Sequence, residues 1–386
     1  MVIYRAIKIL MTSKFLYSLL LSSVLLIASC KQNSGDLEMT TEKVHTFYYN
    51  WYGTPEHDKK YFHWNHDILP HWSDTTWNNA GGYAGGNDIG ANFYPELGCY
   101  SSNDPKTIAE HFKLIRKAGI GVCVISWWGK NSFEDRSIPK YLTIAHKYGI
   151  KVAFHIEPFY KSVEELREQL EYIHAQYGNH PAIFKSNNKP LHYLYDSYKI
   201  NGKEWSKLLK PEGLLSIRNT PLDATMIGLW VHANEGNFFV DSGFDGFYTY
   251  FASDGFVYGS TTSNWQHLSE FATQNDLIFI PSVGPGYDDT RIRPWNAQNL
   301  KKREEGVYYE NMFKCAAELN PDYIAITSFN EWHEGTQIEP AITKTIPNFS
   351  YEDYGKEVTP MFYINKTKDL IDAYQKQTTT ANKIHE

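Results

Sequence analysis

The stretch DPKTIAEHFKLIRKAGIGVCVISWWG, residues 104–129, contains the unit from which the fold is built. Asp104 is suited to cap a helix, and Pro105 fits the first turn of that helix. Apolar side chains then recur on one helical face, at Ile108, Phe112 and Ile115. Gly119 ends this pattern, and the apolar run over 122–129 is typical of a strand buried on both faces. The stretch therefore predicts a helix that leads into a buried strand.

Apolar runs of the same kind recur along the chain. They are short, rich in β-branched and aromatic residues, and mostly separated by helical patterns: 45–52, 151–159, 191–197, 225–233, 244–251, 277–284 and 323–331. Together with 122–129 they predict an α/β fold, a single-domain (β/α)8 TIM barrel over residues 44–372. The main alternative is a doubly wound open sheet, but no glycine-rich GxGxxG loop follows the first strand.

The predicted strands end in residues that a packed core would not select. A core favours Val, Ile and Leu, whereas these strand ends carry polar aromatic, amide and acidic side chains: Tyr49, Trp128, Glu157, His232, Tyr250, Asn330 and Glu331. In a barrel the chemistry gathers at this end of the strands. Aromatic residues make up 16% of the chain, which either a large core or a cleft lined with flat rings would explain. We therefore expect a carbohydrate-binding cleft here.

The stretch FNEWHEGTQIEP, residues 329–340, follows the last predicted strand. Glu331 and Glu334 would point to opposite faces of a continuing strand, so the chain must turn after Asn330, and Gly335 can help it do so. A helical turn would bring both carboxylates to one side. Glycoside cleavage needs such a pair, one group as proton donor and one as an electron-rich group. Glu339, beyond the turn, is expected to be structural or a peripheral contact.

Metal binding is not predicted. Three histidines in one loop have a spacing that matches no helix or hairpin ligand set: His63, His66 and His71. The sequence HEGTQ, residues 333–337, is similar to the HExxH zinc motif, but Gln337 replaces the second histidine and Gly335 breaks the required helix. Among the cysteines, Cys123 and Cys315 are predicted to be buried thiols.

Three segments resemble glycoside hydrolase family 99, the endo-α-1,2-mannosidases and bacterial endo-α-1,2-mannanases: FYYNWYGTP, SSNDPKTIAEHFKLIRKAGIGVCVISWWG and FNEWHEGTQIEP. The similarity extends over most of residues 44–370. It implies a (β/α)8 barrel without a metal or other cofactor. It also implies retaining cleavage of internal α-1,2-mannosidic bonds in α-mannan or high-mannose oligosaccharides.

The resemblance also implies roles for individual residues. Glu331 matches a base that activates the 2-hydroxyl of the sugar, giving a 1,2-anhydro sugar, and Glu334 matches the acid that protonates the leaving oxygen and later activates water. Trp128 of the SWWG segment matches a tryptophan of the subsite before the cleaved residue. Further substrate contacts are expected from strand-end position: Tyr49, Glu157, His232, Tyr250 and Asn330.

Two other functions fit parts of the pattern. A barrel glycosidase of different specificity could use Glu331 as the nucleophile of a covalent glycosyl-enzyme. A non-catalytic surface lipoprotein that binds glycans would equally use the aromatic residues, but it would gain nothing from the two spaced glutamates. Product analysis and a panel of defined mannosides and glucosides separate these hypotheses.

The N-terminus has the features of a lipoprotein signal peptide over residues 1–29. Basic residues precede an apolar run over 15–28, which is too short to span a membrane, and the run ends in IASC at Cys30. We expect lipidated Cys30 to anchor the protein at a bacterial envelope membrane through a polar tether over 30–43.

The charge and the remaining segments complete these expectations. The formal net charge is −7, and the signal segment contributes only positive charges, so the mature chain is more acidic still and is not expected to bind nucleic acid. A lipid anchor places the protein at the cell envelope, on the outer membrane and facing either the periplasm or the surface. Residues 373–386 are predicted to form a C-terminal tail, and a monomer is expected.

Overall fold

The computed structural model describes residues 39–385, apart from 75–77, 79 and 356–357. Cys30, the predicted signal peptide 1–29 and most of the predicted tether 30–43 lie outside the described residues. The compact unit that carries the fold begins at Thr40. Its first strand begins at Thr41, within the segment expected to be the tether. No helix in the described part of the chain is long and apolar enough to cross a membrane.

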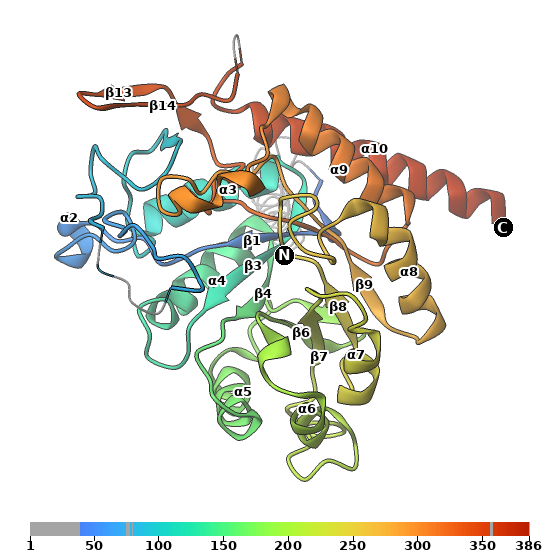
Figure 1. The fold of residues 1–386 in the computed structure, drawn as a ribbon. Helices are drawn as coiled ribbons and strands as arrows, with labels where there is room; N and C mark the ends of the chain where they lie inside the picture. Colours follow the sequence, from blue (N-terminus) through green and yellow to red (C-terminus); the bar gives the residue numbers. More distant parts are fainter. Residues whose placement is uncertain (1–38, 75–77, 79, 356–357, 386) are drawn as a thin grey trace, which may run out of the picture. The chain divides into compact units, whose positions relative to one another are not determined.

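The centre of this unit is a ring of parallel strands (Figure 1), each hydrogen-bonded to its neighbours in the order β10-β11-β1-β3-β4-β6-β7-β8-β9. Their bounds are β1 Thr41–Tyr48, β3 Ile120–Trp127, β4 Lys151–Ile156, β6 Lys189–Leu194, β7 Thr225–Leu229, β8 Gly246–Tyr248, β9 Ile278–Ile280, β10 Ser282–Val283 and β11 Ile324–Ile326. Only Pro281 separates β9, which pairs with β8, from β10, which pairs with β11. When β9 and β10 are taken as one interrupted strand, the (β/α)8 prediction is confirmed, and each strand coincides with a predicted run.

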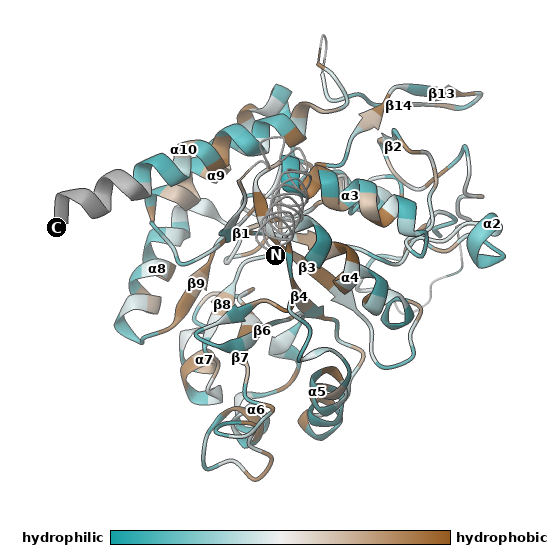
Figure 2. Cartoon of the chain, turned by 180° about the vertical axis from the view of Figure 1, so that it is seen from behind, coloured by the Kyte–Doolittle hydropathy of each residue, from teal (hydrophilic) through white to brown (hydrophobic). Residues whose placement is uncertain are grey.

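Helices surround the strands (Figure 1): α3 Pro105–Lys117, α4 Ile138–Tyr148, α5 Val163–Tyr177, α6 Gly202–Leu209, α7 Gly236–Ser242, α8 Trp265–Gln274, α9 Val307–Glu318 and α10 Phe362–His385. In Figure 2 the β9 strand is hydrophobic, whereas the neighbouring α8 is largely hydrophilic. The predicted start of α3 is confirmed, because the Asp104 side chain accepts a hydrogen bond from the backbone nitrogen of Lys106 at 3.0 Å. The last helix, α10, includes residues 373–385, which the sequence suggested as a tail.

Shorter elements complete the unit: α2 Pro55–Asp58, β2 Tyr94–Pro95, β5 Lys185–Ser186, β12 Ala341–Ile342, β13 Lys344–Ile346, β14 Phe349–Tyr351, and the 3-10 helices η1 Asp135–Ser137, η2 Ser197–Lys199, η3 Thr262–Asn264, η4 Pro294–Asn299 and η5 Glu304–Gly306. The pairing of β2 with β12 is antiparallel. It joins the long loop after β1 to the segment that follows the two glutamates, so both lie at the same end of the barrel.

Aromatic rings fill the inside of the barrel. The buried ring of Phe47 on β1 lies 4.8 Å from that of His155 and 5.4 Å from that of Tyr193, measured between centroids. Tyr193 is hydrogen-bonded to Nδ1 of His45 at 2.7 Å, and Tyr248 to Nε2 of His155 at 2.7 Å. A large aromatic core therefore accounts for part of the 16% aromatic content.

The cysteine predictions have different outcomes. Cys123 is buried in β3, as predicted. Cys315 is exposed on α9, so the prediction of a second buried thiol is wrong. The buried face of α9 consists of Tyr309, Met312, Phe313 and Ala316. Cys315 lies between these positions in sequence but on the flank of the helix, away from the centre of this face, because each residue is rotated by about 100° from the one before it.

Candidate active site

The two glutamates lie on a short hydrogen-bonded turn over residues 328–336, which we call the carboxylate turn. Oγ of Ser328 accepts a hydrogen bond from the backbone nitrogen of Glu331 at 2.7 Å and caps its start. At its end Gly335 adopts a left-handed φ of +62°. Gly335 donates to the carbonyl of Trp332 at 3.2 Å and Thr336 to that of Glu331 at 3.3 Å, which is the Schellman pattern of a helix end. The predicted turn after Asn330 is therefore confirmed, and it brings Glu331 and Glu334 to the same cavity.

Neighbouring segments hold the outer side of the carboxylate turn. The backbone nitrogen of Asp288 donates to the carbonyl of Glu334 at 2.8 Å. A Cβ atom at Gly335 would meet the carbonyl oxygen of Asp288 at 2.9 Å, so only glycine fits between the two backbones. The buried guanidinium of Arg303 donates through Nη2 to the carbonyls of Gly335 and Gln337, both at 2.8 Å.

The carboxylate turn closes one side of a cavity of about 260 Å³ at the C-terminal end of the strands. The side chains that line it come from the ends of the barrel strands and the loops that follow them: Tyr49, Trp51, His63, His66, His155, Glu157, Tyr195, Tyr250, Ile292, Arg293, Glu331 and Glu334. This is the end of a barrel where active sites are found. Five of the eight predicted catalytic and substrate-binding residues thus meet in one cavity.

Glu331 is almost completely buried, with 6% of its surface exposed. Burial raises the pKa of its carboxyl well above the usual range, and the negative charge of Glu334 raises this pKa further. The positive charge of Arg293 opposes the increase. Oε2 of Glu331 accepts long hydrogen bonds of 3.4 Å from the hydroxyl of Tyr52 and from the backbone nitrogen of His333.

Glu334 has a different environment from Glu331. Its Oε1 accepts a hydrogen bond from Nη1 of Arg293 at 3.2 Å, and the same Nη1 lies 3.1 Å from Oδ2 of Asp289. Burial raises the pKa of Glu334, the Arg293 guanidinium lowers it, and the charges of Asp289 and Glu157 raise it again. Both glutamates therefore have raised pKa values, and the ionisation of Glu331 depends on the charge of Glu334.

Glu157 is the third carboxylate of the cavity, and its position at the end of β4 is well defined. Its Oε1 accepts hydrogen bonds from Oγ of Ser126 at 2.7 Å and from Nδ1 of His155 at 3.0 Å. Nε2 of His155 is in turn 2.7 Å from the hydroxyl of Tyr248. The ring of His155 therefore connects the barrel core to the cavity and fixes the direction of the Glu157 carboxylate.

Two predicted tyrosines meet at the cavity wall, where the hydroxyls of Tyr49 and Tyr250 are hydrogen-bonded to each other. Asn330 is fully buried, and its side chain forms hydrogen bonds with the backbone of Tyr49. Its Oδ1 accepts from the Tyr49 nitrogen at 2.7 Å, and its Nδ2 donates to the Tyr49 carbonyl at 2.9 Å. The structure therefore places Asn330 as a positioning residue for Tyr49 rather than in the cavity wall.

Trp128 and His232, also predicted substrate contacts, lie apart from the cavity lining. Trp128 follows β3 with 38% of its surface exposed, while its neighbour Trp127 is buried and donates through Nε1 to Asp135 at 2.9 Å. His232 is exposed, and its ring packs against Tyr198 at 5.4 Å between centroids. Contact of either residue with substrate stays a prediction.

Arg293 is a cavity residue that the sequence did not reveal. It belongs to the loop after β10, and no motif or strand end marks it. His63 and His66 of the loop after β1 also form part of the cavity wall, where the ring of His63 stacks on that of Trp51 at 4.3 Å between centroids. Burial lowers the pKa of His63 to about 3, so this ring is neutral. The gathering of histidine and tryptophan in one long loop was the signal that could have identified this wall.

A comparison with known protein families identifies the chain. Residues 39–376 match the model of glycosyl hydrolase family 99. The chain belongs to this family. It is therefore a glycoside hydrolase, and the predicted resemblance is confirmed. Membership therefore argues against the alternative that the protein binds glycans without cleaving them.

Relatives from animals and bacteria share most of the family 99 domain. The chain is 45% identical over 351 residues to the glycoprotein endo-alpha-1,2-mannosidase of Mus musculus, covering 87% of this chain and 76% of the relative. It is 46% identical over 348 residues to the Xenopus laevis protein of the same name, covering 86% and 77%. The solved GH99 endo-alpha-mannosidase of Bacteroides thetaiotaomicron superimposes with a TM-score of 0.85 at 45% identity, covering 88% of this chain and 99% of that one.

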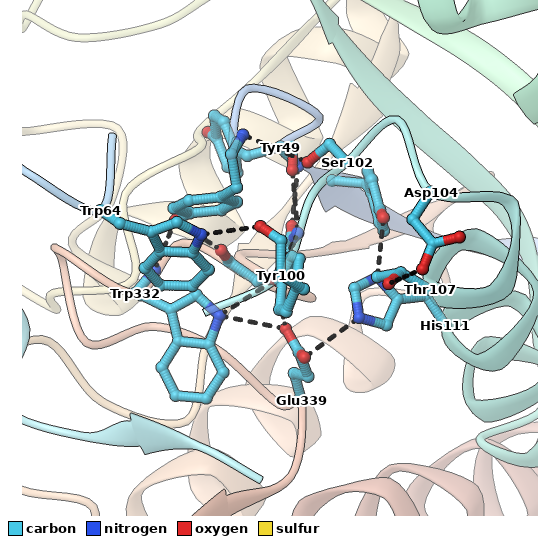
Figure 3. A network of polar contacts seen from close by, with 12 residues as sticks. Tyr49, Trp64, Tyr100, Ser102, Asp104, Thr107, His111, Trp332 and Glu339 are labelled. Atoms are coloured by element: carbon cyan, nitrogen blue, oxygen red, sulfur yellow. Dashed lines mark hydrogen bonds and ion pairs between the residues drawn. The ribbon is translucent and has the colours of Figure 1, made fainter. Parts of the chain in front are cut away.

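Glu339 supports the carboxylate turn of this family 99 enzyme from behind (Figure 3). Its buried carboxylate accepts hydrogen bonds from the Tyr100 hydroxyl at 2.7 Å, Nε1 of Trp332 at 3.0 Å and Nε2 of His111 at 3.1 Å. Nδ2 of Asn330 also contacts the Tyr100 hydroxyl, at 3.3 Å. Glu339 therefore has a structural role, which was one of the two roles expected for it. Its hydrogen bonds connect α3, the loop after β1 and the carboxylate turn.

Replacing Gly335 by alanine should displace the carboxylates. A left-handed φ costs a non-glycine residue roughly 1–2 kcal/mol, and the new Cβ would also press on Asp288. We expect the free energy of unfolding, measured with denaturant, to fall by about 2 kcal/mol and kcat/KM to fall at least roughly tenfold.

Gly81→Ala is the matched control, because Gly81 has a φ of +98° but no atom within 4 Å of the place that a Cβ would occupy. This variant should lose stability through backbone strain and keep the activity of the parent. Equal losses of activity in both variants would show that strain alone, and not the contact with Asp288, explains the effect.

Proposed function

We propose that this family 99 enzyme hydrolyses internal α-1,2-mannosidic bonds in α-mannan or high-mannose oligosaccharides with retention of configuration. The observation that carries the proposal is the pair of glutamates three residues apart on one turn, which both line the cavity at the C-terminal end of the strands. The names of the Mus musculus and Xenopus laevis relatives support the α-1,2-mannosidase specificity.

In the proposed first step, ionised Glu331 removes the proton from the sugar's 2-hydroxyl. The freed oxygen attacks the anomeric carbon as the bond to the leaving oxygen breaks, and Glu334 gives its proton to that oxygen. The product is a 1,2-anhydro sugar. In the second step Glu334 takes a proton from water, the water oxygen attacks the anomeric carbon, and Glu331 returns its proton to the 2-oxygen. Two inversions give retention, and both glutamates regain their starting protonation states.

The cycle requires one proton on the pair, located on Glu334 when the bond breaks. The raised pKa values of both glutamates are consistent with one retained proton. Arg293 contacts Glu334 and favours its ionised form, so the glycosidic oxygen must compete with Arg293 for this carboxyl. In the proposed cycle Arg293 therefore affects how readily Glu334 holds its proton, while Arg293 itself stays protonated.

Glu331→Gln and Glu334→Gln should each lower product release from α-mannan by at least roughly a thousandfold, measured by mass spectrometry of the oligosaccharides, because each removes a proton-transfer group. The buried carboxyl of Glu331 is costly to ionise, so Glu331→Gln should not be less stable than the parent at pH 7. Full activity of either variant would refute the proposal.

Two additions to this experiment separate the alternatives. Azide should not rescue Glu331→Gln, whereas a glycosyl azide product would identify Glu331 as a direct nucleophile. A panel of defined mannosides and glucosides tests the specificity, and cleavage of glucosides alone would favour a barrel glycosidase of another specificity.

Arg293→Met should shift the pH profile of kcat/KM to higher pH. Loss of the guanidinium destabilises both carboxylates, so the pKa values of Glu331 and Glu334 rise. The acidic limb reports ionisation of the base and the alkaline limb deprotonation of the acid, and both limbs should move upward. Arg293→Lys keeps the charge and should leave the limbs close to those of the parent. A shift of the Met variant to lower pH would contradict this assignment.

We also propose that Cys30 carries the lipid that holds the enzyme at the cell envelope. The support is the basic and apolar signal segment that ends in IASC. In a bacterial host, Cys30→Ser should move the enzyme from the membrane fraction to the soluble fraction. Cys315→Ser, which replaces the exposed thiol on α9, is the control and should stay with the membrane. Unchanged membrane binding of Cys30→Ser would refute the lipid anchor.

A further inference from the structure

A group of aromatic side chains lies outside the cavity, and the mechanism does not use it. We call Trp72, Phe256 and Trp295 the rim platform. Trp72 is the most exposed of the three, with 61% of its surface open to solvent. Its ring meets that of Trp295 at 4.1 Å between centroids and at 88°, so the two indoles form a corner. Large exposed rings of this kind commonly mark a binding surface.

Aromatic contacts connect the rim platform to the cavity. The ring of Tyr250, in the cavity wall, lies 5.3 Å from that of Phe251, which lies 5.1 Å from that of Phe256. Phe256 is 6.3 Å from Trp72, again between centroids. The contacts therefore form a continuous series from the cavity wall to the exposed indole.

The backbone makes a second connection between the cavity and the platform. The nitrogen of Leu69 donates to the carbonyl of Ile292 at 2.7 Å, and Nε1 of Trp295 donates to the carbonyl of Leu69 at 3.1 Å. Ile292 lines the cavity. The loops after β1, β8 and β10 supply the platform, all at the end of the barrel that carries the carboxylates.

The size of the cavity indicates what the platform would bind. At about 260 Å³ the cavity is smaller than typical ligand pockets of roughly 300–1,000 Å³, so an oligosaccharide longer than a few units must extend beyond it. Sugars present C–H faces that pack on aromatic rings. A chain that leaves the cavity along Tyr250 and Phe251 reaches the corner formed by Trp72 and Trp295.

We propose that the rim platform is an additional sugar subsite, which binds a unit of the same mannan chain away from the cleaved bond. The proposal rests on the proposed function, since it assumes a mannose polymer in the cavity. The platform selects long chains, because it contributes binding that a substrate confined to the cavity does not receive.

The test compares substrates of different length. In Trp72→Ala, KM for long α-1,2-mannan should rise roughly tenfold more than KM for the shortest manno-oligosaccharide that the parent cleaves, as expected for the loss of one aromatic contact. Trp72→Phe retains a ring and should recover most of the difference. Leu214→Ala is the control, because Leu214 is 92% exposed but lies between α6 and β7, at the opposite end of the barrel.

A binding measurement separates this proposal from the proposed function. Retardation of Glu334→Gln in gels containing α-mannan should weaken when Trp72→Ala is added. If the parent releases no product from mannan, the proposed function fails, whatever the gel shows. If KM changes equally for long and short substrates, or retardation is unchanged by Trp72→Ala, the platform is not a sugar subsite and the proposal is overturned.

Discussion

The mutual repulsion of two carboxylates on one short buried turn governs how the site is built. Glu331 and Glu334 are close enough for each charge to disfavour the other, and burial disfavours both. Such a pair persists only if its backbone cannot relax. Ser328 at the start of the turn and Gly335 at its end supply this restraint through hydrogen bonds and a left-handed residue. Arg293 supplies the compensating positive charge.

The surrounding side chains hold this turn in the barrel. Glu339 accepts three hydrogen bonds from separate segments, and Asn330 binds both backbone polar groups of Tyr49. Arg303 holds the carbonyls that follow the helical turn. Glu339 and Asn330 are buried polar groups whose partners are provided by the fold, and unpaired groups of this kind would cost roughly 1–3 kcal/mol or more. Polar groups of the surrounding fold thus hold the carboxylate turn and its neighbours in place through hydrogen bonds.

Sequence patterns predicted the barrel because its strands and helices have local signatures. Strands buried on both faces are continuous apolar runs, and α3 begins with the capping Asp104 followed by Pro105. The same reasoning located Glu331 and Glu334, since a polar sequence after an apolar strand marks the catalytic end of a barrel. It was wrong for Cys315, whose apolar neighbours in sequence hide its outward position on α9. An apolar surrounding sequence does not determine which face a residue occupies.

Local patterns in the chain were enough to define the order of strands and helices, the turn that carries two carboxylates, and the glycine that ends it. These features depend on residues a few positions apart, whose periodicity and backbone preferences act locally. The folded barrel was needed to show that Arg293 faces Glu334, that His63 and Trp51 form a wall, and that Asn330 turns toward Tyr49. Tyr49 and Asn330 are 281 residues apart, and such partners meet only when β11 pairs with β1 and the barrel closes.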